Sequence, residues 1–246
     1  MKAVILAAGI ASRLRPLTDN TPKCLLRLGH KTILERTIDN VISNDIDKLI
    51  IVTGYLEKLI KDFIEDHYPK LNVTYIYNDV YDSTNNIYSL WLVKDHIQNS
   101  DMLLMDSDII FDHRIIKLLL TSGTGNFLAI RSEHSLGEEE MKVIVNSDNL
   151  ITQISKKIDP RLAAGESIGI EKFESDYLQT LFTKLDQRIA NDGRVNDFYE
   201  EAFQDTIDNG QLLYALDVGD YKCIEIDTPE DIDEAEKMIA KYIDKS

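Results

Sequence analysis

The chain has 246 residues, of which 43% are hydrophobic, so it can bury a full core as one large α/β domain or two small ones. Its formal net charge is −16, and no run of lysine and arginine stands out. A nucleic-acid polymer or an anionic membrane needs clustered cations, so neither is expected as a partner. A single nucleotide is still compatible with this charge, because a few local cations and a metal ion can hold it.

The cysteines and the apolar runs exclude further classes of protein and site. Cys24 and Cys223 form no CxxC pair and join no cysteine–histidine cluster, so neither a disulfide framework nor a zinc site is predicted. No apolar run approaches the roughly 20 residues that span a bilayer. The apolar run 3–11 imitates a short signal peptide, but it is equally typical of a buried strand, and Arg13 and Arg15 follow at once. We therefore expect a cytoplasmic protein.

The first half of the chain alternates strand and helix patterns. Short apolar runs predict buried strands, and apolar residues three and four apart predict helices. In chain order, the patterns predict strand 3–7, helix 32–43, strand 48–52, helix 56–68, strand 73–77, helix 86–96 and strand 102–105. This order predicts an α/β fold with a Rossmann-like, mostly parallel central sheet that is covered by helices on both faces.

The pattern changes after residue 120. Strands are expected over 127–131, 142–145, 151–154, 167–173, 212–216 and 222–225, and helices over 177–190 and 198–207. Thr228 and Pro229 then begin a last helix, as its N-cap and first residue. No linker occurs, so we expect one domain. Its nucleotide-binding part would be about 1–120 and 222–246, and its acceptor-binding part, which forms a lid, about 121–221.

The strongest motif follows the first predicted strand. Small residues there let the backbone approach a ligand closely, and their N–H groups can hold phosphates. Arg13 and Lys23 add positive charge. The motif is neither a P-loop nor the three-glycine dinucleotide turn, and an ordinary turn with two surface cations is an equal alternative on spacing alone. The predicted nucleotide-binding residues of this loop are Leu6, Ala8, Gly9, Ala11 and Ser12.

Acidic residues follow two of the other predicted strands. Asp106 and Asp108 stand at the end of strand 102–105, and residues two apart lie on the same side of a strand. Asp227 directly precedes the last helix. Ligands bind at the carboxyl ends of parallel strands, and carboxylate oxygens suit Mg²⁺. Each aspartate alone could instead cap a turn or offset a helix dipole.

The N-terminal segment resembles the signature of the nucleotide-sugar pyrophosphorylase superfamily, a Leu-Ala-Ala-Gly-x-Gly-x-Arg-Leu loop followed by Pro-Lys. Ala11 departs from this signature, because it stands where the family usually has its second glycine. The resemblance implies a GT-A-like nucleotidyltransferase fold with Lys23 and Arg13 as catalytic residues. In the family, the arginine holds the outer phosphates and the lysine neutralises the reacting α-phosphate. The resemblance also implies that Asp108 and Asp227 bind a catalytic Mg²⁺.

An asparagine-rich segment around Asn85 and Asn86 precedes one of the predicted helices. Side-chain amides can read a base edge, and they can also cap a helix. The form Asn-Asn-x-Tyr-Ser-Leu is similar to the branch that contains the bacterial choline-phosphate cytidylyltransferases, whereas sugar-specific members tend to have a Gly-Thr-Ala segment. With Gly54 and Thr84, these asparagines are the predicted nucleoside contacts, and CTP is the predicted nucleotide.

The middle of the chain should select the acceptor. Related inositol-phosphate enzymes have a Glu-Glu-x-x-Lys-Val segment in the acceptor lid, so Lys142 and Lys156 are candidate contacts to the acceptor phosphate. The charged run around Lys142 could instead form a solvated turn. Tyr199 and Glu200 are candidates to bind a cationic group through ring and charge.

The resemblance implies an enzyme that transfers CMP from CTP to a small, phosphocholine-like phosphate or phosphonate monoester and releases pyrophosphate. A sugar-1-phosphate or inositol-1-phosphate nucleotidyltransferase is the alternative within the enzymes. A non-catalytic nucleotide-binding regulatory module is the alternative from another class. The residues that such a module would be expected to lose, Arg13, Lys23 and the aspartates, are all present.

Overall fold

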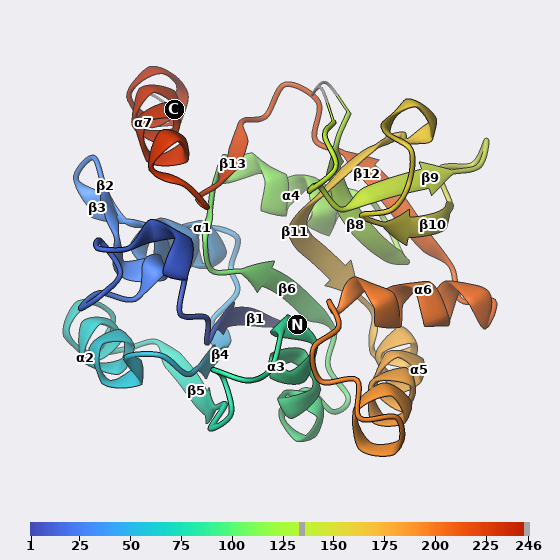
Figure 1. The fold of residues 1–246 in the computed structure, drawn as a ribbon, viewed down its shortest axis with the longest axis horizontal. Helices are drawn as coiled ribbons and strands as arrows, with labels where there is room; N and C mark the ends of the chain where they lie inside the picture. The colour runs from blue at the N-terminus through green and yellow to red at the C-terminus, as the bar shows by residue number, and fades with distance from the viewer. Residues whose placement is uncertain (133–135, 244–246) are drawn as a thin grey trace.

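The computed structural model describes residues 1–132 and 136–243, and within them nine strands form one sheet (Figure 1). Its first part is parallel and has the order β6, β1, β4, β5. These strands are β1 (Lys2–Ala7), β4 (Lys48–Thr53), β5 (Asn72–Tyr77) and β6 (Met102–Asp106). They confirm the strands predicted for the first half of the chain.

The second half continues the same sheet with antiparallel strands. β11 (Gly165–Phe173) pairs with β6, and its other neighbours are β8 (Asn126–Arg131) and β9 (Lys142–Val145). β10 (Ile151–Ser155) pairs with β9, and β12 (Leu213–Asp217) runs parallel to β8. Two small two-stranded sheets lie outside it. They are β2 (Arg27–Leu28) with β3 (Lys31–Thr32), and β7 (Ile109–Phe111) with β13 (Cys223–Glu225).

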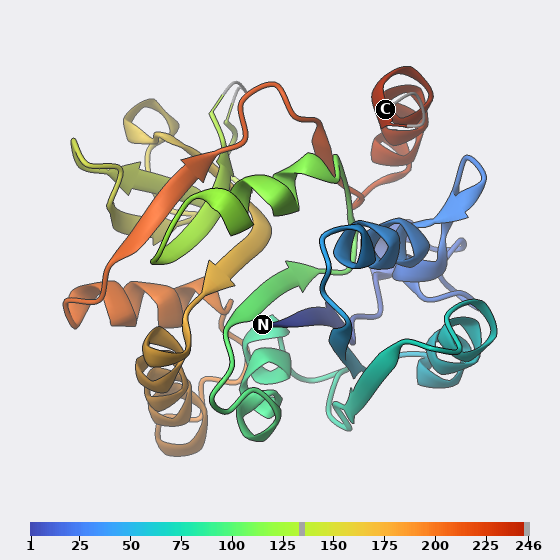
Figure 2. The ribbon, with the colours of Figure 1, turned by 180° about the vertical axis from the view of Figure 1, so that it is seen from behind.

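Helices cover both faces of the sheet because the buried strands are apolar on both sides. In β1, Val4 and Leu6 belong to one core cluster, and Ala3, Ile5 and Ala7 belong to the other. The first cluster lies under α3 (Asn86–Leu92), α5 (Ser175–Asp186) and α6 (Glu200–Asp208). The second lies under α1 (Ile33–Ser43), α2 (Glu57–His67) and α4 (Arg114–Thr121), of which α1 and α4 face the viewer in Figure 2.

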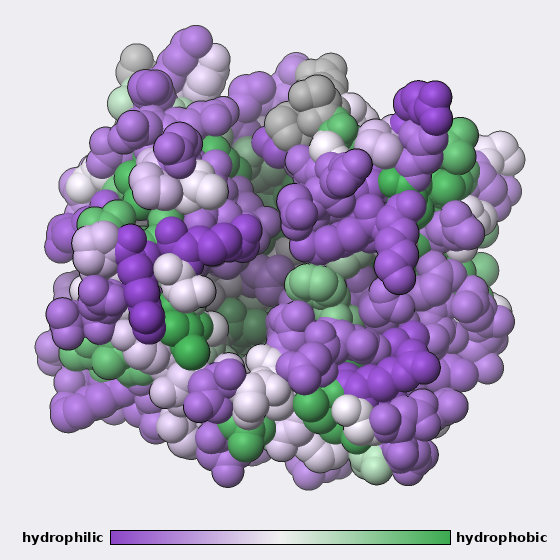
Figure 3. All heavy atoms as spheres, in the orientation of Figure 1, coloured by the Kyte–Doolittle hydropathy of each residue, from purple (hydrophilic) through white to green (hydrophobic). Residues whose placement is uncertain are grey.

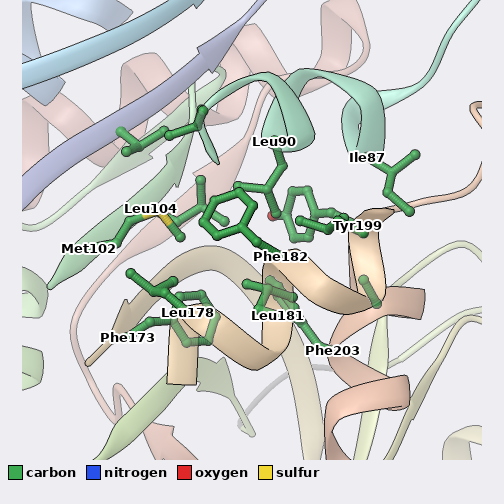
Figure 4. Packing of buried hydrophobic residues seen from close by; sticks show 14 of the residues in the cluster. Ile87, Leu90, Met102, Leu104, Phe173, Leu178, Leu181, Phe182, Tyr199 and Phe203 are labelled. Carbon is green, nitrogen blue, oxygen red and sulfur yellow. The ribbon is translucent and has the colours of Figure 1, made fainter. Parts of the chain in front are cut away.

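The core under α3, α5 and α6 contains a group of aromatic rings (Figure 4). Phe173 of β11 contacts Tyr177 and Phe203, and Tyr199 contacts Phe203 with ring centroids 5.1 Å apart. Tyr199 is fully buried and lies at the start of α6. This packing fixes α6 against the sheet beside the end of β6, where the candidate site begins.

The last helix, α7 (Pro229–Met238), begins as predicted. Thr228 is its N-cap, Asp231 completes a capping box, and Pro229 occupies the first turn. A third core cluster joins α7 to the N-terminal loop through Leu14 and Ile226. The segment that precedes α7 therefore lies beside the loop that follows β1, although the two are far apart in sequence (Figure 1).

Some element boundaries differ from the predictions. The helix predicted over 86–96 ends at Leu92 and is followed by a separate 3₁₀ turn, Lys94–His96. The helix predicted over 177–190 ends at Asp186 and continues as a π turn, Gln187–Asn191. The sequence analysis assigned no element to β7 or α4, which lie between the strands predicted over 102–105 and 127–131. Among the described residues, no helix is long and apolar enough to cross a membrane.

Candidate active site

The loop after β1 is held in shape by contacts from outside it. Ala11 has a left-handed backbone, with φ 52° and ψ 51°, at the position where the resembled signature has glycine. This conformation costs a non-glycine residue about 1–2 kcal/mol. The Ala11 carbonyl accepts hydrogen bonds from the Leu14 N–H and from the hydroxyl of buried Thr18. The Tyr55 hydroxyl in turn donates to the Thr18 carbonyl at 3.0 Å. These bonds offset the strain and keep the loop closed.

A cavity of about 320 Å³ opens beside this loop, and Figure 3 shows the molecular face hollowed near its centre. Its walls come from the carboxyl ends of β1 and β6, the segment before α3 and the segment before α7. The predicted site residues that line it are Leu6, Ala8, Gly9, Ala11, Arg13, Lys23, Thr84, Asn85, Asn86, Asp108 and Asp227. The predicted residues that do not line it are Ser12, Gly54, Lys142, Lys156, Tyr199 and Glu200.

The structure brings Lys23, Asp108 and Asp227 into direct contact. Asp108 lies in the turn between β6 and β7, and Asp227 lies between β13 and α7. The Lys23 Nζ donates to Asp108 Oδ2 at 2.7 Å and to Asp227 Oδ1 at 2.8 Å. Arg13 approaches the other oxygen of Asp227, with 2.7 Å between nitrogen and Oδ2. Four predicted residues from three distant segments therefore form one charged group.

Opposite charges stabilise each other in this group. Burial alone would lower the pKa of Lys23, but the charges and hydrogen bonds of Asp108 and Asp227 outweigh it, so the pKa is raised and the side chain stays an ammonium. Burial likewise favours a raised pKa for Asp227. Lys23 and Arg13 outweigh that effect and hold the pKa of Asp227 below its usual value.

A third carboxylate joins the two aspartates. Glu225, the last residue of β13, offers an oxygen within 4.8 Å of oxygens from Asp108 and Asp227. Asp108 Oδ1 is buried and has no hydrogen-bond partner among residues 1–132 and 136–243. Three carboxylates with such an oxygen fit a divalent cation that prefers oxygen ligands. Asp106 is outside this group, because its carboxylate accepts a hydrogen bond from the Tyr199 hydroxyl at 2.9 Å.

Desolvation in the cleft and the charges of Asp108 and Asp227 raise the pKa of Glu225 to about 8. The sequence analysis did not single out Glu225 as a ligand. The alternation argument applied to Asp106 and Asp108 would have found it, since Glu225 stands two residues before Asp227.

The end of the cavity that adjoins α3 is built around Asn78. Its side-chain amide is buried and donates to the hydroxyls of Thr84 and Ser89, both at 3.2 Å. The Asn85 side-chain oxygen accepts from the Asn86 N–H at 2.7 Å as the N-cap of α3. The Asn86 side-chain oxygen accepts from the Tyr199 N–H at 3.0 Å. Both asparagine oxygens thus have structural partners, and capping, one of the two roles considered for this segment, is confirmed.

Gly54 supports the cavity from behind. A Cβ added at this position would lie 2.7 Å from the Ala8 carbonyl oxygen and 2.7 Å from the Tyr81 Cβ. Tyr81 lines the cavity, so glycine is required here for the loop after β1 to approach the segment that carries Tyr81. Gly54 therefore positions the pocket wall and does not line the pocket.

The two predicted acceptor lysines have other partners in this structure. Lys142 is fully buried, and its Nζ donates to the carbonyls of Gly137, Glu138 and Glu140 at 3.0–3.1 Å. It is therefore a structural residue that holds the segment 137–140, in place of the predicted contact with an acceptor phosphate. The Lys156 Nζ lies over the Phe198 ring, 4.4 Å from its centroid.

Comparison with known proteins identifies the architecture of this site. The nucleotidyl transferase family matches residues 2–241. The chain belongs to the nucleotidyl transferase family. The choline-phosphate cytidylyltransferase of Streptococcus pneumoniae is 29% identical over 236 residues, which cover 92% of this chain and 97% of that protein. The solved CTP:phosphocholine cytidylyltransferase of the same species superposes with a TM-score of 0.76 at 25% identity and covers 97% of this chain and 98% of that one.

A third relative acts on a different acceptor, as its name states. The CTP:phosphoglutamine cytidylyltransferase of Campylobacter jejuni is 26% identical over 255 residues, which cover 95% of this chain and 98% of that protein. The nucleotidyltransferase described here thus has full-length relatives with different acceptors. The family match confirms the GT-A-like fold and the transferase class, whereas the acceptor of this chain must be inferred from its own residues.

The nucleotidyltransferase has a second group of acids behind the cavity wall. We call Asp106, Glu171 and Glu200 the acidic cluster. Asp106 lines the cavity, and Glu171 and Glu200 are buried. Burial raises the pKa of Glu200 to about 7, and burial together with the charges of Asp106 and Glu200 raises that of Glu171 well above its usual range. Tyr199, which donates to Asp106, lies against the same group.

Proposed function

We propose that this nucleotidyltransferase transfers CMP from CTP to a small phosphate or phosphonate monoester and releases pyrophosphate, with Mg²⁺ as its metal. The observation that carries the proposal is the meeting of Lys23 and Arg13 with Asp108 and Asp227 beside a loop of small residues. The two cations and the backbone N–H groups of the loop suit a polyphosphate, and the two carboxylates suit a divalent cation. The use of CTP is supported by the two cytidylyltransferase relatives.

Each residue of the site has a distinct role in the transfer. The backbone N–H groups of the loop after β1 bind the outer phosphates, and Arg13 offsets their charge. Lys23 turns from the carboxylates toward the α-phosphate and stabilises the charge that develops there. Asp108, Asp227 and Glu225 hold the Mg²⁺, which supplies further positive charge beside the reacting phosphate. The acceptor oxygen attacks the α-phosphorus in line and pyrophosphate leaves, so no covalent enzyme intermediate is needed.

The acceptor-binding part corresponds to the second half of the chain, about 121–221, and the nucleotide-binding part to the remainder. The acceptor phosphate enters opposite the outgoing pyrophosphate, and the rest of the acceptor points toward Tyr199 and Glu200. Because these two residues accompany further buried carboxylates, a positively charged acceptor fits this end better than a neutral sugar or inositol. Lys156 lies on the same side and lowers the pKa of Glu200 by its charge, against the larger effect of burial.

The test is direct competition between CTP and UTP with a panel of acceptor phosphates, Mg²⁺ and a pyrophosphate readout. A pocket that accepts a hydrogen bond from the cytosine amine leaves that acceptor unpaired with uracil, at a cost of about 1–3 kcal/mol. We therefore expect a preference for CTP of roughly ten- to a hundredfold. Asp108→Asn should lower turnover and raise the Mg²⁺ concentration that it needs, and Asp62→Asn, which changes a surface ion pair with Lys58, is the matched control.

Two outcomes would contradict the proposal. Equal use of CTP and UTP, with a sugar 1-phosphate as the best acceptor, would favour a sugar-nucleotide enzyme. Tight CTP binding without turnover on any acceptor would favour a non-catalytic nucleotide-binding module.

A further inference from the structure

The acidic cluster lies on one face of the sheet. In the antiparallel pair of β11 and β6, Glu171 is opposite Leu104, so both side chains lie on the same face. Asp106 follows Leu104 by two residues and shares that face. Gly169 leaves room there, because a Cβ at its position would lie 2.7 Å from Asp106 Oδ2. The strand geometry thus brings Asp106 and Glu171 together on the side where α6 supplies Glu200.

The buried carboxylates of this cluster lack partners among the described residues. Glu171 is 0% exposed, and neither of its oxygens makes a hydrogen bond. The hydroxyl of Ser167 lies nearby without reaching hydrogen-bond geometry, and it opposes the rise in the pKa of Glu171. Glu200 Oε2 is also buried without a partner. Leaving such groups unsatisfied is costly, and native proteins rarely do so unless a ligand, ion or water completes the site.

The nearby cations of the protein do not neutralise the cluster. Lys23 lowers the pKa of Asp106 only as a secondary influence, and its ammonium is already bonded to Asp108 and Asp227. Lys156 acts on Glu200 but lies over the Phe198 ring. Within the part of the chain that the structure describes, the three carboxyl groups therefore lack a cation that pairs with them, which agrees with their raised pKa values. A cation that enters from the cavity side would meet Asp106 first, since Asp106 lines the cavity.

The chemistry of the cluster selects among cations. A primary ammonium group carries three N–H donors, and carboxylates are acceptors only. A quaternary ammonium group has no donor and is recognised by the faces of several aromatic rings. Tyr199 and Tyr177 both lie near this cluster, but their rings are packed in the core against Phe203 and Phe173, and the Tyr199 hydroxyl is bonded to Asp106. The cluster therefore offers hydrogen-bond acceptors in place of an aromatic cage.

On the basis of the proposed function, we propose that the acceptor is an aminoalkyl phosphate or phosphonate whose primary ammonium group binds Asp106, Glu171 and Glu200. The ammonium passes Asp106, which lines the cavity, and reaches Glu171 and Glu200 behind that wall, while the phosphate end lies toward Lys23. Glu171 and Asp106 are then specificity-determining residues that the sequence analysis did not assign to the acceptor. The charge and the donors of the ammonium satisfy the unpartnered oxygens, which gives the fully buried Glu171 a partner.

A series of acceptors that differ only in N-methylation tests the proposal. Phosphoethanolamine, its N-methyl and N,N-dimethyl forms and phosphocholine carry three, two, one and zero N–H donors, and all are cationic near pH 7. With CTP and Mg²⁺, we expect kcat/KM to fall along the series, by at least about tenfold from the first member to the last, mainly through KM. Equal or better use of phosphocholine would overturn the inference while leaving cytidylyl transfer intact. Failure of all four acceptors, with turnover on a sugar phosphate, would overturn the proposed function as well.

Glu171→Gln then tests the residue itself. The change keeps the shape of the side chain and removes its charge, so KM for phosphoethanolamine should rise about ten- to a hundredfold, while KM for CTP stays unchanged. Glu201→Gln is the matched control, because Glu201 follows Glu200 on α6 but pairs with Arg188 outside the cluster. An unchanged KM for phosphoethanolamine in Glu171→Gln would contradict the assignment. If this variant does not fold, the methylation series on the unmodified protein decides alone.

Discussion

Replacing Lys23 by methionine should change metal binding and turnover in opposite directions. In the structure, the Lys23 ammonium bonds to Asp108 at 2.7 Å and to Asp227 at 2.8 Å, and thus occupies two of the oxygens that fit a divalent cation. A metal ion must displace it. Hydrogen bonds between charged groups contribute about 1.5–3 kcal/mol each, and partial exposure of these side chains favours the low end for the pair. Lys23→Met should therefore bind metal about ten- to a hundredfold more tightly without nucleotide.

Turnover should fall in the same variant by roughly 10²–10³, the effect of removing one preorganised charge from the transition state. Metal binding can be followed by electron paramagnetic resonance with Mn²⁺, which accepts the same oxygen ligands as Mg²⁺, and turnover by pyrophosphate release. Lys31→Met is the matched control, since Lys31 pairs with Asp39 away from the cavity. Unchanged or weaker Mn²⁺ binding in Lys23→Met would refute the competition argument. Near-normal turnover would refute the role of Lys23 at the α-phosphate.

Three further predictions concern other parts of the site. Asp227→Asn should raise the Mg²⁺ concentration needed for half-maximal turnover by roughly tenfold or more, as a metal titration would show. Burial raises the pKa of Glu200 from 4.5 to about 7, so the folded state binds an extra proton in this window and loses stability as the pH rises through it. Glu200→Gln should therefore reduce the fall in Tm between pH 5 and pH 8, and an undiminished fall would contradict this. Gly54→Ala places a Cβ 2.7 Å from the Ala8 oxygen, so it should destabilise the fold by about 1–3 kcal/mol in denaturant unfolding and raise KM for CTP.

Sequence reasoning selected residues that the structure brings together where each lies in a local motif. The loop after β1, Lys23 and the two aspartates are each recognisable within a few residues. The parallel strands β1 and β6 place the loop and Asp108 at one end of the sheet, and the pairing of β13 with β7 brings Asp227 beside them. Ala11 shows that the backbone conformation of the loop is set by contacts within and around it. The position keeps the left-handed backbone that favours glycine, because bonds to its carbonyl, including one from Thr18, hold it there.

Sequence reasoning failed where a role depends on which strands are neighbours. β11 also carries Glu166 and Lys172, and only the pairing of β11 with β6 shows that Glu171 lies beside Asp106. Lys142 shows the reverse error. The resemblance suggested a contact with the acceptor phosphate, but Lys142 is the buried first residue of β9, and its ammonium bonds to backbone carbonyls. Neither outcome is encoded in spacing along the chain.

The contact between Lys23 and Asp227 has a consequence for the order in which the protein matures. The two residues are 204 positions apart, whereas β1, β4, β5 and β6 all lie within the first 106 residues. During synthesis, the parallel strands can associate long before Asp227 emerges from the ribosome. Contacts between residues so distant in sequence also form late, because closing a long loop costs entropy before it brings any gain. The group of Lys23, Asp108 and Asp227 is therefore among the last parts to assemble, so its formation reports that the late segments of the chain have folded.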